Sequence, residues 1–421
     1  MALNNLSKEL NNKALEIEVK DAGEGQYICP ICGSKHATIL DNSSSDKAEN
    51  RDKHTLFCND CMFSGDAISL YMRRYDLRAS DAIREIKMKY GEASEKKEAY
   101  LTQSAGASLD EFFKNIENQT PPIPTGYKQL DEALEGGLYE GLYILGAIPS
   151  MGKTTYILQI ADQIAASGHD VIFFSLEMAK SELIAKSLSR LTLQISKNAK
   201  TAKNDRSITS PERIKHYTDA DKKLIQDAGG AYKQVGAHLW IIEGVGNIDI
   251  KKIREIVDKH TQFTGNKPIV IIDYFQILPP PNDKLDSKQA ADRNVVEIKR
   301  MSRDYKIPII LISSLNRAGY DKSTNMSAFK ESGAIEYTAD VLLGLQASGA
   351  EDAGAGANDQ CKGKAIREVE IKILKNRHGR ITAKGDEIQY KYYAMFNLMQ
   401  EQGGGEFIPT YEEGETPFKD L

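Results

Sequence analysis

A short run of residues in the first half of the chain has the types and spacing needed to bind the phosphates of a nucleotide. The run Ala147-Ile-Pro-Ser-Met-Gly-Lys-Thr-Thr155 follows an apolar segment and precedes a helical pattern. A loop between a strand and a helix turns backbone N–H groups and the positive end of the helix dipole towards anions. In such a loop the lysine contacts the β- and γ-phosphates of ATP, and the following hydroxyl binds Mg²⁺. We therefore expect ATP to contact Ala147, Pro149, Ser150, Met151, Gly152, Lys153, Thr154 and Thr155.

This loop departs from the usual GxxxxGK[ST] pattern at its first position, which is Ala147 instead of glycine. Gly146 precedes it, and we expect that glycine to relax the backbone there. The alternative is a chance Gly-Lys-Thr after a strand. The helical pattern TTYILQIADQIAASG that follows disfavours that alternative.

Two acidic residues follow apolar runs elsewhere in the same region. Glu177 comes just after DVIFFSL, and Asp273 ends the run PIVIID. In an open α/β sheet, ligands bind outside the carboxyl ends of the strands. We expect Glu177 to deprotonate the water that attacks the γ-phosphate, and Asp273 to hold Mg²⁺ together with Thr154. The alternative for Glu177 is an acid that is stabilised by a helix N-terminus.

Four of the five cysteines form two CxxC pairs. One CxxC turn lets two sulfurs bind a tetrahedral ion, and a second turn completes the set. The pairs predict a zinc site made of Cys29, Cys32, Cys58 and Cys61, with a redox role as the alternative. His36 and His54 are candidates to replace a thiolate, although solvated or core histidines are commoner. Cys361 stands alone and is expected to be an unpaired thiol without a role.

The elements that position these residues are predicted by apolar runs that mostly alternate with helical patterns. The strand-like runs are LYILGAI, DVIFFSLE, HLWIIEG, PIVIIDYF, IPIILISSL, DVLLGLQ and EVEIKIL. Apolar strands separated by helices indicate an α/β fold whose largely parallel sheet is buried on both faces. The stretch QASGAEDAGAGANDQCKGK is rich in Gly and Ala and is predicted to be a mobile surface loop.

These patterns divide the chain into four segments. We expect a zinc-binding domain over 1–95, a linker over 96–121, an α/β ATPase domain over 122–400 and a flexible tail over 401–421. Within the linker, residues 108–119 predict a short amphipathic helix, with Ser108 as its N-cap and Glu111 completing a capping box.

Composition narrows the class of protein. The 421 residues are 41% hydrophobic and 27% charged, as in a soluble globular protein. No run is long and apolar enough for a membrane span, and the N-terminus lacks the features of a signal peptide, so we expect a cytoplasmic location. The net charge of −5 argues against coating nucleic acid by bulk charge, but it leaves room for a basic groove or ring.

The segments IPTG, LDEALEGGLYEG, AIPSMGKTT, FFSLEM, IIDYFQIL, SSLNRA, KESGAIEYTAD and KNRHG occur in this order between about residues 122 and 400. In sequence and order they resemble DnaB-type replicative helicases. The resemblance implies a RecA-like hexameric ring, a homo-hexamer that holds ATP between neighbouring subunits. It also implies movement from 5′ to 3′ along single-stranded DNA.

The same resemblance assigns further residues. Lys375 and Arg377 match basic fingers that reach the ATP of the adjacent subunit, although a basic turn after an edge strand is the alternative. Ser314 stands where the family usually has a glutamine that senses the γ-phosphate. The polar stretches after the Asp273 and Ser314 strands match loops that track DNA phosphates. Their candidate contacts, for each of which a solvated charge is equally expected, are Lys284, Lys288, Arg293, Arg317 and Lys330.

The run YICPICGS to FCNDCMFSGDAISLYMRRY resembles the zinc-binding domain of bacterial and phage primases, although those often have CxxH as the first pair. The resemblance implies that this module grips single-stranded DNA or docks a separate primase. Residues 95–122 leave no room for a polymerising domain, so we do not expect primer synthesis by this chain alone. A helicase loader and a single-strand-binding protein are further expected partners.

Two other functions remain open from the residues. A RadA-type repair protein also joins a zinc site to a RecA-like core, and its KNRFG motif is similar to KNRHG. The wide gap between the CxxC pairs, the SLEM and DYFQIL segments and the missing protease-like domain favour the helicase instead. A nucleotide switch or helicase loader with weak turnover is the second alternative, which Ser314 leaves open.

Overall fold

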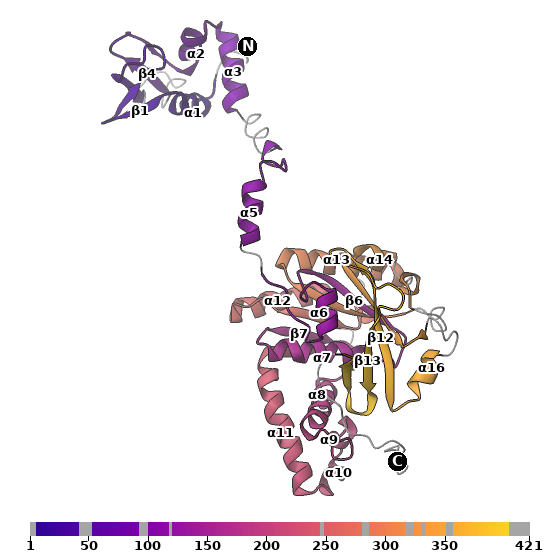
Figure 1. The fold of residues 1–421 in the computed structure, drawn as a ribbon. Coiled ribbons are helices and arrows are strands. Elements are labelled where there is room, and N and C mark those ends of the chain that lie inside the picture. The colour runs from indigo at the N-terminus through magenta and orange to yellow at the C-terminus, as the bar shows by residue number, and fades with distance from the viewer. Residues whose placement is uncertain are drawn as a thin grey trace. The chain divides into compact units, whose positions relative to one another are not determined.

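The computed structural model describes residues 6–41, 53–91, 100–117, 120–244, 248–279, 286–315, 324–329, 333–350 and 357–403. The chain divides into two compact units, Met1–Thr120 and Pro121–Leu421 (Figure 1). Within the described ranges, no helix is both long and apolar enough to cross a bilayer.

The first unit packs helices against a small antiparallel sheet. The helices are α1 (Lys8–Glu18), α2 (Ala67–Tyr75) and α3 (Ala79–Tyr90). The sheet has the order β1 (Lys20–Gly23), β2 (Gln26–Ile28), β3 (Ala37–Asp41), β4 (His54–Cys58) and β5 (Ser64–Gly65). Leu15, Leu56, Leu70 and Ile86 are fully buried between these elements and form the centre of its core.

Helix α5 (Leu109–Glu117) occupies the position of the helix that the sequence predicts over residues 108–119. Ser108, which the sequence predicts as the N-cap, lies directly before it. Its hydroxyl also donates to the carbonyl of Ser104, over 3.3 Å.

The second unit is built on a sheet in which the order of the described strands is β14-β13-β12-β11-β6-β10-β9-β7-β8. From β11 to β8 the neighbouring strands are parallel, and β12, β13 and β14 add antiparallel neighbours at one side. This confirms the predicted α/β class with a largely parallel sheet. The strands are β6 (Gly141–Ala147), β7 (Val171–Ser175), β8 (Leu239–Glu243), β9 (Ile269–Asp273), β10 (Pro308–Ser314), β11 (Val341–Ala347), β12 (Ile366–Asn376), β13 (Ile388–Tyr393) and β14 (Leu398–Glu401).

Helices cover both faces of this sheet, with α12, α13 and α14 on one face and α7, α8 and α11 on the other (Figure 1). Every residue of β6, β7 and β9 is therefore buried, which is why these runs are uniformly apolar. The helices of this unit are α6 (Lys128–Ala133), α7 (Lys153–Ala166), α8 (Lys180–Ser196), α9 (Asp205–Thr209), α10 (Pro211–Lys215), α11 (Asp219–Val235), α12 (Ile250–Thr264), α13 (Ser287–Tyr305), α14 (Gly333–Thr338) and α16 (Ala357–Lys362).

One sequence prediction is wrong in part. Residues 346–364 were expected to form a mobile surface loop, but this stretch includes the end of β11 and the helix α16. The Asn358 side chain accepts a 3.0 Å hydrogen bond from the Ala347 N–H, and Cys361 is buried. The small and polar residues of this stretch show no helical pattern, so the sequence did not predict the helix that packs on the core. Residues 351–356 of the stretch, and residues 404–421 of the predicted tail, lie outside the described residues.

Candidate nucleotide and metal sites

The predicted phosphate-binding loop connects β6 to α7, which begins at Lys153. Ser150 and Gly152 adopt left-handed conformations with φ of 66° and 94°. A Cβ on Gly152 would lie 2.6 Å from Met399 and 2.8 Å from the Tyr392 ring, so this position requires glycine. Such a turn before a helix gathers backbone N–H groups into a concave anion-binding surface.

The side chain of Lys153 folds back over this loop. Its Nζ donates to the carbonyls of Ala147, over 2.9 Å, and Ile148, over 3.3 Å. Burial lowers the pKa of Lys153 to about 8, against the opposing charges of Asp273 and Glu177. A partly buried ammonium group that is held mainly by carbonyls gains much from a bound anion.

Thr154 and Asp273 meet beside the loop. The Thr154 hydroxyl donates a 2.7 Å hydrogen bond to Oδ2 of Asp273, the last residue of β9. Burial raises the pKa of Asp273 to about 6, although the hydrogen bond from Thr154 opposes this rise. Neighbouring ligands of an octahedral Mg²⁺ lie about 2.9 Å apart. The spacing of these two oxygens therefore fits the ion that the sequence predicts.

Glu177 lies two residues beyond the end of β7, and its side chain is exposed. Ser175 and Asp273 are partners in the sheet, so both acids lie at the same edge. The Glu177 carboxylate raises the pKa values of both Asp273 and Lys153, which places its charge near the phosphate loop.

Gly146 and Ser314 flank the loop in the sheet. Ser314 is the partner of Ala147, and its carbonyl accepts a 3.2 Å hydrogen bond from Gln276. Gly146 does not adopt a left-handed conformation, so the expected relaxed backbone is wrong. A Cβ at Gly146 would lie 2.2 Å from the ring of Phe329, and close packing is the reason for glycine there.

Two residues that the sequence did not suggest also support the loop. The Arg367 guanidinium donates a 2.7 Å hydrogen bond to the Ser150 carbonyl and lies 5.4 Å from the ring centre of Tyr392. The Tyr392 hydroxyl is 3.4 Å from that of Thr155. Ser150 and Arg367 are 217 positions apart, so no local pattern signals this contact.

Lys375 and Arg377 lie away from the chain's own phosphate loop. Strand β12 is antiparallel to β11, so its last residue, Asn376, pairs with Val341 at the start of β11. Lys375 Nζ donates to the carbonyls of Glu336 and Tyr337, over 2.8 and 3.1 Å. The basic pair is thus at the edge of the sheet opposite to the predicted nucleotide site.

Only part of the predicted DNA-binding set can be located. Lys288 and Arg293 are exposed on α13. Lys284, Arg317 and Lys330 lie outside the described residues.

The CxxC cysteines come together in the first unit. Their four Sγ atoms lie within 4.8 Å of one another. The Cys29–Cys61 and Cys32–Cys58 sulfur pairs are each 3.7 Å apart. Zn–S bonds of about 2.3 Å in a tetrahedron put the sulfurs about 3.8 Å apart, so the cluster fits zinc. In the described part of the chain neither His36 nor His54 joins this group, and His36 contacts Asp60 instead.

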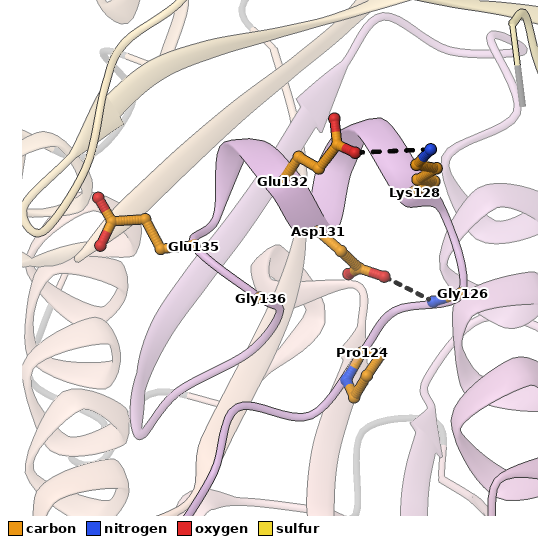
Figure 2. Close-up of a pocket in the computed structure, with 7 residues that line it drawn as sticks. All are labelled: Pro124, Gly126, Lys128, Asp131, Glu132, Glu135 and Gly136. Atoms are coloured by element: carbon orange, nitrogen blue, oxygen red, sulfur yellow. Dashed lines mark hydrogen bonds and ion pairs between the residues drawn. The ribbon is translucent and has the colours of Figure 1, made fainter.

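A depression near the start of the second unit differs from the nucleotide site because its lining includes several carboxylates (Figure 2). Its carboxylates include Asp131, which accepts hydrogen bonds from the N–H groups of Thr125 and Gly126. Thr125 also contacts Gln163, which is ten residues, or about 15 Å, along α7 from Lys153. The acidic lining does not suit phosphates, and Asp131 serves to hold a turn. The depression is lined by Pro124, Gly126, Lys128, Asp131, Glu132, Glu135 and Gly136.

Comparison with known proteins agrees with the geometry of the second unit. The family model described as DnaB-like helicase C terminal domain matches residues 122–397. The replicative DNA helicase DnaC of Bacillus subtilis is 26% identical over 329 residues, which cover 76% of this chain and 67% of that protein. The replicative DNA helicase DnaB of Geobacillus stearothermophilus is 28% identical over 276 residues, or 64% of this chain and 55% of that protein.

A third relative, the replicative DNA helicase DnaB of Leifsonia xyli, is 31% identical over 58% of this chain and 51% of its own length. The chain thus spans about half to two thirds of these relatives. Among solved structures, that of a DnaB-like replicative helicase, described with its interactions with primase, superposes with a TM-score of 0.57 at 22% identity. The match covers 78% of this chain and 76% of that one, and it supports the fold. None of these matches favours the RadA-type alternative.

Proposed function

Because the chain belongs to the family of the DnaB-like helicase C-terminal domain, we propose that it is a replicative helicase that hydrolyses ATP to move 5′ to 3′ along single-stranded DNA. The observation that carries this proposal is the contact between Thr154 and Asp273, 2.7 Å long, beside the partly buried Lys153. These residues provide an ammonium group and a pair of Mg²⁺ ligands at the carboxyl edge of a parallel sheet.

Each residue of this edge has a defined task. Lys153 leaves its carbonyl partners to bind the β- and γ-phosphates, and the backbone from Ala147 to Thr155 holds the phosphate chain. Thr154 and Asp273 would hold Mg²⁺, and the bound ion would supply positive charge to neutralise the phosphate oxygens. Glu177 orients and deprotonates the attacking water. Ser314 is the last residue of β10 and pairs with Ala147 in the sheet. In this position it senses the γ-phosphate.

Lys375 and Arg377 act on the ATP of a neighbouring subunit. Their position at the opposite edge of the sheet from their own phosphate loop supports this role. A ring of six identical subunits brings the basic edge of one against the nucleotide edge of the next. The two cations then stabilise charge that develops on the γ-phosphate during hydrolysis.

DNA passes along the loops that join these elements. Lys288 and Arg293 on α13, with Lys284, Arg317 and Lys330, contact the phosphate backbone without reading sequence. The cysteine cluster binds zinc and shapes a module that grips single-stranded DNA or docks a separate primase. A loader and a single-strand-binding protein complete the expected partners, in the cytoplasm.

An unwinding assay tests the helicase directly. Wild-type oligomer should displace a strand from a forked duplex with a 5′ tail when ATP and Mg²⁺ are present. Lys153→Ala should reduce ATP hydrolysis by about 100-fold or more and abolish strand displacement, because no ammonium group then neutralises the charge of the phosphates. Lys223→Ala, an exposed lysine on α11, is the matched control. A wild-type protein that hydrolyses ATP on single-stranded DNA but never unwinds the fork would favour the loader.

Mixed oligomers test the role of Arg377 in the neighbouring site. Lys153→Ala subunits lack a working phosphate loop, and Arg377→Ala subunits lack the finger. When the two are mixed, some interfaces combine an intact loop with an intact finger, so hydrolysis should return. If the mixture stays inactive while each variant assembles, Arg377 does not act between subunits.

The zinc assignment has a separate test. Metal analysis should find about one zinc per chain, and Cys58→Ser should lower that content because a four-sulfur site loses one ligand. Cys361→Ser is the control, since Cys361 lies in the other unit. Unchanged zinc in Cys58→Ser would remove the assignment and leave the ATPase proposal intact.

A further inference from the structure

Asp340 joins elements from different parts of the second unit. It is only 6% exposed and directly precedes β11. Its Oδ2 accepts hydrogen bonds from the Leu142 N–H, over 2.7 Å, and from Lys299 Nζ, over 2.5 Å. Its Oδ1 lies 3.3 Å from the Arg377 guanidinium. A carboxylate that is removed from water needs such partners, so removing any one of them changes how the others are held.

The short helix α14 links the same groups a second time. Near its start, the Ala334 N–H donates to Asp292 on α13, over 3.3 Å. At its other end, the Tyr337 carbonyl accepts a 2.8 Å hydrogen bond from Arg377, and Lys375 donates to the same carbonyl. The last carbonyls of a helix lack partners within the helix and attract cations. The basic pair is therefore attached to α13 through both Asp340 and α14, which lies beside α13 (Figure 1).

Helix α13 connects this network to the face that is proposed to meet DNA. Lys288 and Arg293 are exposed on its first half, and Lys299 is six residues beyond Arg293. At 1.5 Å per residue, about 9 Å of regular helix separates Arg293 from Lys299. Over that length the helix is a continuous element that joins the two positions.

We propose that Asp340 is a positioning residue that holds Arg377 ready for the ATP of a neighbouring subunit and, through Lys299, ties this arginine to α13. The inference rests on the proposed function, in which Arg377 acts between subunits and α13 meets DNA. The Arg377 side chain is 45% exposed, which leaves its guanidinium room to turn towards a phosphate. When it turns, the Asp340 carboxylate loses one cation and its bond to Lys299 strengthens. Binding of DNA at α13 and engagement of Arg377 thereby affect each other, as coupled equilibria must.

Steady-state ATP hydrolysis by the full chain, with and without an oligo-dT strand, tests this link. Asp340→Asn should lower kcat by about tenfold with little change in KM, because the finger acts mainly in the transition state. In the Arg377→Ala background, adding Asp340→Asn should change kcat by less than about twofold, since a residue that acts through Arg377 has nothing left to position. A purely structural role would instead give additive losses.

Lys299→Met tests the connection to DNA, because it removes the cation on α13 and leaves Asp340 its bonds to Leu142 and Arg377. It should reduce the stimulation of hydrolysis by oligo-dT by about fivefold, within the usual range of coupling between two sites. Arg303→Met removes an exposed cation from the same helix and should keep the wild-type stimulation. Because Lys299 is partly exposed, this variant tests the link between Asp340 and α13 even if Asp340→Asn fails to fold.

The outcomes separate this inference from the proposed function. If Arg377→Ala keeps the wild-type kcat, the finger assignment itself is wrong. If Arg377→Ala loses activity but Asp340→Asn does not, or if their losses are additive, Asp340 does not position the finger. Unchanged DNA stimulation in Lys299→Met overturns the link to α13.

Discussion

The Thr154 hydroxyl donates to Oδ2 of Asp273 over 2.7 Å, which joins the first turn of α7 to the last residue of β9. The two residues are 119 positions apart. Strand β10 separates β6 from β9 in the sheet, so the contact reaches across it from the loop. The contact therefore depends on the strand order of the sheet as well as on the loop.

Asp273→Asn should weaken the use of Mg²⁺ without preventing nucleotide binding. The amide is a poorer ligand for a hard cation than a carboxylate, so kcat should fall by about 100-fold and the Mg²⁺ concentration for half-maximal rate should rise. Titration of hydrolysis with Mg²⁺ measures both. Thr154→Ser keeps a hydroxyl and should retain most of the activity, whereas a wild-type Mg²⁺ dependence in Asp273→Asn would contradict the assignment.

The pH dependence of hydrolysis should follow the charges of Asp273 and Lys153. Asp273 must be ionised to hold Mg²⁺, and burial raises its pKa to about 6. Lys153 must be protonated to bind phosphate, and burial lowers its pKa to about 8. The value of kcat/KM for ATP should thus rise with pH through about 6 and fall through about 8, since this parameter reports the free protein.

The alkaline limb is the decisive one, because a terminal phosphate group also titrates at a pH of about 6. Arginine stays protonated throughout this range. Lys153→Arg, even with a reduced rate, should therefore lose the fall above pH 8. If its alkaline limb matches that of the wild type, another group causes the decline.

Arg367→Ala should weaken ATP binding by loosening the phosphate loop. The lost hydrogen bond to the Ser150 carbonyl is 2.7 Å long and holds a residue in a left-handed conformation. A hydrogen bond from a charged donor contributes about 1.5–3 kcal/mol, of which part is lost to solvent, so we expect KM for ATP to rise by roughly 5- to 20-fold. Arg367→Lys should recover part of the loss. An unchanged KM in both variants would show that the loop is stable without this contact.

Glu18→Gln should destabilise the first unit. The Glu18 carboxylate accepts hydrogen bonds from Tyr71, over 2.8 Å, and from Lys89, over 2.5 Å. Burial alone would raise the pKa of Glu18, but these partners and Tyr90 outweigh it and lower the pKa from 4.5 to about 2. The stabilisation is complete above pH 4.5 and is lost as the pH falls from 4.5 towards 2.

Hydrogen exchange at neutral pH measures this effect in the full chain. Loss of charged hydrogen bonds to a buried group costs about 2 kcal/mol, which corresponds to roughly 30-fold faster exchange in α1 and α3. Glu16→Gln, an exposed residue on the same helix, is the matched control. Equal exchange in the two variants would mean that the network contributes little.

Local sequence patterns predicted the parts of the fold that are uniformly buried. The runs that became β6, β7 and β9 are apolar throughout because both of their faces are covered. Strands β13 and β14 were not predicted, since IQYKYY and LMQE mix buried and partly exposed residues at the antiparallel side of the sheet. The phosphate loop and the cysteine pairs were found because their chemistry depends on close spacing.

Contacts between residues that are far apart in the sequence could not be predicted from local patterns. Asp340 lies within KESGAIEYTAD, a segment that resembles the helicase family, but its partners Lys299 and Arg377 come from two other elements. The sequence predicts that Gly146 relaxes the backbone, whereas the structure shows that the nearby ring of Phe329 leaves no room for a side chain there. Where a contact with a distant residue determines the residue type at a position, the sequence around that position shows no periodic or local pattern.

Gly146→Ala should therefore destabilise the second unit and disturb the nucleotide site. The new Cβ would lie 2.2 Å from Phe329 and 2.8 Å from Leu315. Forcing one carbon into a packed core costs about 1–3 kcal/mol, and the shift falls next to Ala147, so KM for ATP should also rise. Thermal unfolding and hydrolysis measure the two effects.

Gly229→Ala in α11 is the same kind of substitution, but it should stabilise the protein instead of destabilising it. A Cβ at Gly229 meets nothing within 4 Å, and the residue is inside a helix. Alanine should stabilise the protein by about 0.5–1 kcal/mol there and leave ATP hydrolysis unchanged. Phe329→Leu combined with Gly146→Ala should recover part of the lost stability, since a smaller side chain leaves room for the Cβ. If Gly146→Ala is as stable as Gly229→Ala, the close approach of Phe329 does not determine the residue at position 146.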